Sequence, residues 1–409
     1  MDSRDRTALT YRYERRRAVA NGILETAGTT FLLLIAVKWF RSGATAKALV
    51  AGGGSMGLLA TPLVVTFVQA AGWPAARAAA RLAAGGAACF LVMALLPWLP
   101  VFVAGSVLAM AASSAGIPLM TQVYQENYPE RQRGQFFSRT VMIRIGVAAL
   151  FSELAGRALS AHIDSFRRLL LVFAAAFAAS AYCLARCPSR PLSALDGSHP
   201  FRALRYARSD PLFRQTLISW MLMGFANLMM LPMRVEYLAN PKYGLALSVG
   251  EIAFLTGVVP NSARLLLSPI WGRLFDRMNF FVLRVTVNLG FAAGILAFFT
   301  SNGVSGLILG AIIYGVSNAG GDVAWGLWVT KFAAPERVAD YMSVHTFFTG
   351  VRGVLAPLLA FHLVSALAME TLGWLSAVLI VLASLVLVPE IRFGRRARAA
   401  AALIEEVSE

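Results

Sequence analysis

Long apolar stretches alternate with short polar segments along the whole chain. A bilayer core of about 30 Å needs roughly 20 consecutive apolar residues in a helix, and twelve stretches approach or exceed this length. We predict membrane-spanning helices over residues 18–40, 46–69, 79–97, 99–123, 138–161, 168–187, 215–237, 247–271, 280–300, 303–329, 343–367 and 371–389. The pattern therefore predicts an all-α integral membrane protein with twelve transmembrane helices.

The composition excludes the main alternatives to a membrane protein. The chain has 409 residues, of which 58% are hydrophobic and only 14% charged, whereas soluble domains carry about 25% charged residues. Such a composition also excludes a disordered chain. The three cysteines, Cys89, Cys183 and Cys187, cannot form a secreted disulfide framework.

The net charge of +16 indicates membrane orientation rather than nucleic-acid binding, because the basic residues lie between apolar runs. With the N-terminus inside, 26 Lys and Arg residues, including Arg284, fall in cytoplasmic segments. Only 7, including Lys47 and Arg234, fall outside. By the positive-inside rule, we expect a multi-pass protein of the plasma (cytoplasmic or inner) membrane with both termini cytoplasmic. Anionic lipid headgroups are the expected partner of this charge, and no nucleic acid is.

A polar connection in the middle of the chain separates six predicted spans from six. Short matching sequences recur on its two sides at nearly equal offsets, for example around Pro129 and Pro335. Internal repeats of this kind are common in transporter folds. We predict two pseudo-symmetric six-helix bundles, with a linker and a tail on the cytoplasmic side. The boundaries are 1–187 for the N-terminal bundle, 188–212 for the linker, 213–390 for the C-terminal bundle and 391–409 for the tail.

One loop carries a family resemblance. Between the eighth and ninth spans the chain reads Gly272-Arg273-Leu274-Phe275-Asp276-Arg277. This run resembles the G-x-L-x-D-R loop signature of the major facilitator superfamily, as does the arrangement of two six-helix halves with inside termini. The resemblance implies alternating access between the halves and a gating loop formed by Gly272, Asp276 and Arg277. Glycine permits close helix approach, and the carboxylate can pair with arginine or with free amides at a helix N-terminus.

Charged residues inside the spans are the best candidates for a functional site, because an unpaired charge in the bilayer is costly. Five of them lie at a similar depth, and three asparagines on the same or neighbouring lining helices accompany them. The predicted substrate and coupling cavity consists of Glu25, Arg144, Asn227, Asn261, Arg264, Asn318, Asp322 and Arg352. Structural pairs between these charges are the alternative. Glu153 and Arg157, four residues apart, are expected to form a purely structural ion pair.

The predicted function is secondary active transport of a small solute, coupled to a proton or another ion. Glu25 and Asp322 are the coupling candidates, because carboxyl groups in such a cavity can load and release protons. Three arginines against two acids slightly favour an anionic or zwitterionic substrate. Nucleotide-binding, metal-binding and hydrolase motifs are absent from the sequence, so we expect no enzyme activity, cofactor or metal. We also expect the protein to be a monomer. The alternative is a non-transporting membrane sensor or assembly protein, favoured by the degenerate first-half loop, where Val65 and Gln69 replace the glycine and aspartate.

Overall fold

The computed structural model describes residues 3–191, 206–245, 247–301, 303–327 and 338–408. This part of the chain is helical and contains no strand, only an isolated bridge between Pro74 and Pro191. The N-terminal half consists of α1 (Ser3–Thr26), η1 (Ala27–Phe31), α2 (Leu32–Lys38), α3 (Ala44–Ala70), α4 (Ala75–Leu95), α5 (Leu99–Ala115), α6 (Ile117–Asn127), α7 (Glu130–Ala161), η2 (Ile163–Ser165) and α8 (Phe166–Ala185). The C-terminal half consists of α9 (Tyr206–Ser209), α10 (Pro211–Ala239), η4 (Pro241–Tyr243), α11 (Val249–Ala253), η5 (Phe254–Val258), α12 (Val259–Arg277), α13 (Phe280–Phe299), α14 (Val304–Leu327), α15 (Val338–Leu363) and α16 (Met369–Ser408).

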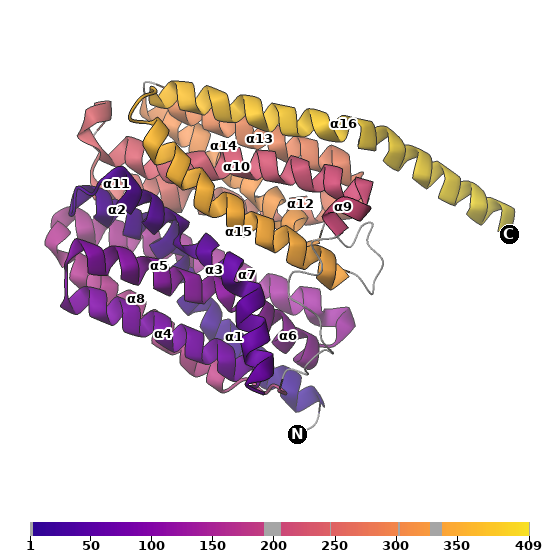
Figure 1. Cartoon of the computed structure of the whole chain (residues 1–409), viewed down its shortest axis with the longest axis horizontal. Coiled ribbons are helices and arrows are strands. Elements are labelled where there is room, and N and C mark those ends of the chain that lie inside the picture. The colour runs from indigo at the N-terminus through magenta and orange to yellow at the C-terminus, as the bar shows by residue number, and fades with distance from the viewer. Residues whose placement is uncertain (1–2, 192–205, 246, 302, 328–337, 409) are drawn as a thin grey trace.

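These elements form the twelve predicted spans. Three spans are built from consecutive pieces: α1 with η1 and α2, α5 with α6, and α11 with η5 and α12. The largest errors in the predicted ends are at the two termini, and α7 also begins eight residues before the predicted start at residue 138. The first helix begins at Ser3 instead of residue 18, and α16 continues to Ser408 through the segment predicted as a tail, projecting beyond the bundles (Figure 1).

Two of the spans are less apolar than the rest. Within the described residues, ten helices are long and apolar enough to cross a membrane. The other two spans are α7 and the α11–α12 run, which carry Arg144 and Arg264 in their middle. They pack against each other, so their charges can meet protein partners instead of lipid.

The two halves form separate bundles that touch along equivalent helices. In Figure 1, α1 to α8 gather on one side and α10 to α16 on the other. The main contacts between bundles are α3 with α15, α7 with α11, η5 and α12, α2 with α10, and η1 with η5. The second span thus meets the eleventh, and the fifth meets the eighth. Each half therefore contributes its own second and fifth helices to the interface, as a duplicated unit requires.

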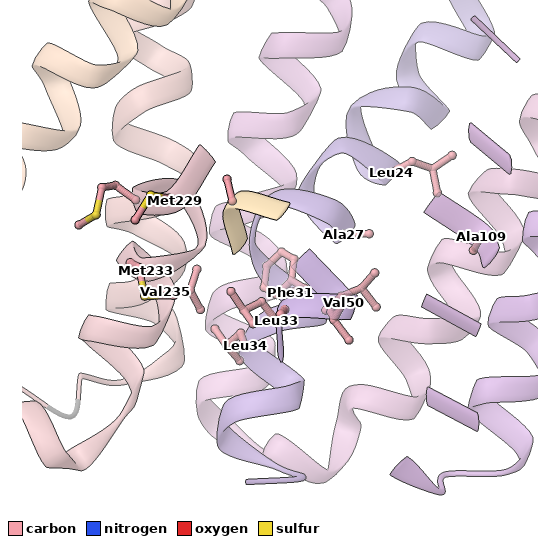
Figure 2. Close-up of a cluster of buried hydrophobic side chains, with 14 of the residues drawn as sticks. Leu24, Ala27, Phe31, Leu33, Leu34, Val50, Ala109, Met229, Met233 and Val235 are labelled. Carbon is pink, nitrogen blue, oxygen red and sulfur yellow. The ribbon is translucent and has the colours of Figure 1, made fainter. Parts of the chain in front are cut away.

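Glycine allows close approach of the helix backbones at this interface. A Cβ on Gly350 of α15 would lie 2.8 Å from the backbone nitrogen of Leu59 on α3, which no side chain tolerates. Figure 2 shows the apolar part of the junction, where Leu33 and Leu34 of α2 lie close to Met233 and Val235 of α10. All four side chains are buried, so hydrophobic packing reinforces the contact.

Polar contacts between the bundles concentrate at the end of the molecule opposite the chain termini. Lys38 donates to the carbonyl of Leu247 at 2.8 Å, and the amide of Gly250 donates to Ser160 Oγ at 2.6 Å. Lys47 of α3 and Glu236 of α10 form an ion pair of 2.6 Å at the same end. The bundles are therefore held together at this end.

Candidate functional site

Four of the predicted site residues form one ion-pair network that spans both bundles. Arg264 Nε of α12 lies 2.6 Å from Asp322 Oδ2 of α14, and Arg264 Nη1 lies 2.6 Å from Glu25 Oε1 of α1. The other oxygen of Glu25 pairs with Arg144 Nε of α7 at 2.9 Å. The pair between Glu25 and Arg264 joins the N-terminal bundle to the C-terminal bundle.

The network is buried at its centre and accessible at its edges. The side chain of Arg264 is 6% exposed, whereas those of Arg144 and Asp322 are 34% and 40% exposed. Two arginines face two acids, so the formal charge of the network is zero. The preference for an anion that the sequence indicated depended on a third arginine in the same layer, and the structure places that arginine, Arg352, elsewhere.

Arg352 belongs to a second cluster inside the C-terminal bundle. It is 7% exposed and donates through Nη1 to the backbone carbonyl of Trp220. Arg284 of α13, fully buried, stacks over the ring of the same tryptophan at 3.5 Å. His345 packs between Trp220 and Trp325, with ring centroids 5.1 and 5.7 Å away. The cluster therefore gathers two guanidinium groups around one tryptophan, one at its ring and one at its backbone carbonyl.

The electrostatics of Arg284 are unusual for a buried group. Its Nε, Nη1 and Nη2 have no hydrogen-bond partner, and no ion pair links it to an acid among the described side chains. A desolvated cation–π contact contributes about 2 kcal/mol, while removing an ion from water costs several kcal/mol. The indole of Trp220 alone therefore does not offset the burial of Arg284.

The three predicted asparagines have different surroundings. Asn261 Oδ1 lies 3.5 Å from Arg264 Nη1, at the limit of a hydrogen bond. Asn318 is half-buried one turn before Asp322 on α14. Asn227 lines a small cavity of about 10 Å³ within the C-terminal bundle, together with Arg234. That volume holds about one water molecule, so this cavity is too small for a solute.

The predicted gating loop is only partly within the described structure. Gly272, Asp276 and Arg277 lie in the last turns of α12, but the side chains of Asp276 and Arg277 lie outside the described residues. A Cβ on Gly272 would meet no described atom within 4 Å. Among the described residues, no second helix approaches Gly272 as closely as expected.

Three charge sites were missed because their basic residues were counted with the loops. Arg284 was counted as cytoplasmic, yet its side chain is fully buried; Arg234 was counted as outside, yet it is 7% exposed and stacks on Tyr314 at 3.7 Å. Lys47 and its partner Glu236 are likewise buried, at 9% and 1% exposure. Their positions could have revealed them, because all four residues lie in or within a few residues of predicted apolar spans.

A large apolar groove lies away from both charge clusters. It is a groove of about 600 Å³ between α3, α4 and α5, lined by apolar side chains such as Leu63 and Phe67. Arg81, stacked on Trp73 at 3.7 Å, is its one charged lining residue. A polar solute would find few partners there, so the ion-pair network at the bundle interface is the better candidate site.

Comparison with known proteins identifies the fold. No protein family model matches the chain, and no curated protein sequence does. Solved structures do match. The nucleoside transporter NupG is similar with a TM-score of 0.71 and 13% identity, covering 93% of this chain and 98% of its own.

Two further structures agree over a similar extent. A D-xylose-proton symporter matches with a TM-score of 0.66 and 16% identity, over 94% of this chain and 96% of its own. The human organic anion transporter MFSD10 matches with a TM-score of 0.65 and 14% identity, over 95% of this chain and 100% of its own. The chain therefore has the fold of the major facilitator superfamily of transporters along nearly its whole length.

Proposed function

We propose that the protein is a secondary active transporter that moves a small polar solute by alternating access between its two bundles. The observation that carries this proposal is the ion pair between Glu25 and Arg264, which crosses the bundle interface inside the membrane. The similar structures include a nucleoside transporter, a sugar–proton symporter and an organic anion transporter. These three solute classes are the ones to test first.

The ion-pair network also supports proton coupling. Separating the bundles at this depth breaks the pair between Glu25 and Arg264, and breaking a buried pair while both charges remain is strongly unfavourable. A proton on Glu25 removes its charge and weakens the attraction. Asp322, more exposed and paired with the same arginine, can exchange protons with water. Proton binding at these carboxylates thereby favours opening of the interface.

The orientation predicted from the basic residues indicates which side of the membrane each end of the molecule faces. With both termini in the cytoplasm, the contact of Lys47 with Glu236 closes the outer end. The state described here is then closed to the outside, with the ion-pair network placed to exchange with the cytoplasm. Substrate release to the cytoplasm, or loading from it, takes place from this state.

The test is transport by the purified protein in liposomes that contain a fluorescent pH indicator. Solutes from the three classes are first screened for thermal stabilisation, and those that stabilise are added to the liposomes. We expect saturable, solute-dependent proton movement, which Glu25→Gln or Asp322→Asn abolishes and the control Glu153→Gln retains. Saturable flux that is insensitive to pH in both the wild type and the variants would contradict the coupling role. Absence of any saturable flux would favour a non-transporting membrane protein.

A further inference from the structure

The cluster around Trp220 carries positive charge that the described chain does not balance. Arg284 and Arg352 both contact Trp220, one over its ring and the other through its backbone carbonyl. Their like charges repel each other. Within the part of the chain that the structure describes, all three side-chain nitrogens of Arg284 and the Nε of Arg352 lack hydrogen-bond partners. A bound anion would accept hydrogen bonds from these unused donors and balance the charge of the two buried guanidinium groups.

We propose that this cluster binds a small oxyanion, such as a carboxylate, phosphate or sulfate group, between the guanidinium groups of Arg284 and Arg352. Arginine offers planar, paired donors that match two oxygens of such a group. It also stays protonated when buried, so the site retains its charge throughout the physiological pH range. The site is distinct from the network around Arg264, whose two positive charges are already matched by two carboxylates.

Packing limits the size of the ligand. The guanidinium group of Arg352 lies directly against Gly224 of α10, where any Cβ would collide with it. The indole of Trp220 and the ring of His345 close the cluster on further sides. These contacts restrict the ligand to a single small oxyanion group.

Trp325 connects the cluster to the ion-pair network at the bundle interface. Trp325, which packs on His345, lies one helical turn after Asp322 on α14. The side chain of Asp322 is 40% exposed, so one aromatic side chain separates the cluster from the exposed edge of the ion-pair network. A free inorganic anion and the anionic group of a larger solute offer the same oxygen acceptors to the two arginines.

The experiment measures thermal unfolding of the purified full-length protein during anion titrations, followed by tryptophan fluorescence. Sodium sulfate, sodium phosphate and sodium benzoate are the probes, with sodium chloride holding the ionic strength constant. We expect a saturable rise in the unfolding temperature. Arg284→Gln and Arg352→Gln should weaken the apparent affinity by roughly tenfold to a hundredfold, the effect of losing a charged hydrogen bond. Arg157→Gln, at an exposed arginine, is the matched control and should respond like the wild type.

The outcomes separate the sources of the anion and can overturn the proposal. A stronger response to benzoate than to sulfate or phosphate assigns the site to the anionic group of an organic solute, and the reverse assigns it to a free inorganic anion. A wild type that responds to none of the probes would show that the chain supplies its own countercharge. An equal response in Arg284→Gln would place binding elsewhere. If Arg284→Gln does not fold, Arg284→Lys and Arg352→Lys keep the charge but lose the paired donors, and should show the same loss. Because no flux is measured, the result does not depend on the proposed transport function.

Discussion

Arg264 offers the sharpest test of the ion-pair network, because one substitution removes two buried contacts. Its guanidinium group pairs with Glu25 and Asp322, each at 2.6 Å, and its side chain is only 6% exposed. Arg264→Gln leaves both carboxylates without this partner. Removing one partner of a buried ion pair costs about 3–5 kcal/mol.

A matched arginine on α7 provides the scale for this loss. Arg157 pairs with Glu153 one turn away, but its side chain is 77% exposed. Exposed pairs contribute about 0.2–1 kcal/mol, so Arg157→Gln should be nearly silent. The expected difference between the two substitutions is about 2–4 kcal/mol in the free energy of unfolding, or roughly thirtyfold or more in the equilibrium constant.

The assay is denaturant unfolding of each variant in the same detergent, followed by tryptophan fluorescence. The double variant Arg264→Gln with Asp322→Asn adds a further check. If part of the loss comes from the carboxylate of Asp322 left unpaired, the double variant should recover about 0.5–3 kcal/mol, the usual range of coupling between contacting residues. An Arg264→Gln variant within 1 kcal/mol of Arg157→Gln would refute the view that the network stabilises this conformation.

Three more predictions concern the rest of the fold. Lys47→Met should lower the free energy of unfolding by about 3–5 kcal/mol, because Glu236 is left buried without its cation. Denaturant unfolding measures this loss. The double variant Lys47→Met with Glu236→Gln should recover much of the lost stability. Gly57→Ala should lower the unfolding temperature, since its Cβ would collide with the backbone of α5. Gly85→Ala has open space around it and should raise stability by about 0.5–1 kcal/mol. Equal effects of the two substitutions would contradict the packing argument. Burial and a nearby carboxylate raise the pKa of the Cys187 thiol to about 12, so maleimide at pH 8 should label Cys187 more than about a hundredfold faster after unfolding in detergent than in the native protein; similar rates would show that the thiol is accessible.

Membrane helices were the part of the structure most accessible to sequence analysis. The lipid core imposes a minimum apolar length on each span, so most helices from α3 to α15 begin and end within a few residues of the predicted positions. Ser3 and Ser408 show where this reasoning fails. A helix that continues into water needs no apolar pattern, so hydropathy cannot report its end.

The candidate site was predictable as a set of residues but not as a set of pairs. Glu25, Arg144, Arg264 and Asp322 were found because charges inside a span stand out against the apolar background. Their sequence positions did not reveal that Arg264 has two acidic partners, since that depends on how α1, α12 and α14 pack. Arg284 was missed because it lies near a span end and was counted as cytoplasmic. Only the position of Trp220 on α10 explains its burial.

The π turns η1 and η5 lie in the same membrane spans as Glu25 and Arg264. They meet at the interface, where the hydroxyl groups of Thr30 and Thr256 lie 3.1 Å apart. A π turn holds one residue more than an α turn, equivalent to about 100° of helical phase. When such a turn shifts by one residue along the helix, that residue rotates around the helix axis. Most of the backbone hydrogen bonds of the helix stay in place. Glu25 lies two residues before η1 and Arg264 six residues after η5, so migration of either turn would re-aim one partner of the pair that joins the bundles. Amide exchange faster at η1 and η5 than in the flanking turns would be the signature of this motion, and uniform protection would argue against it.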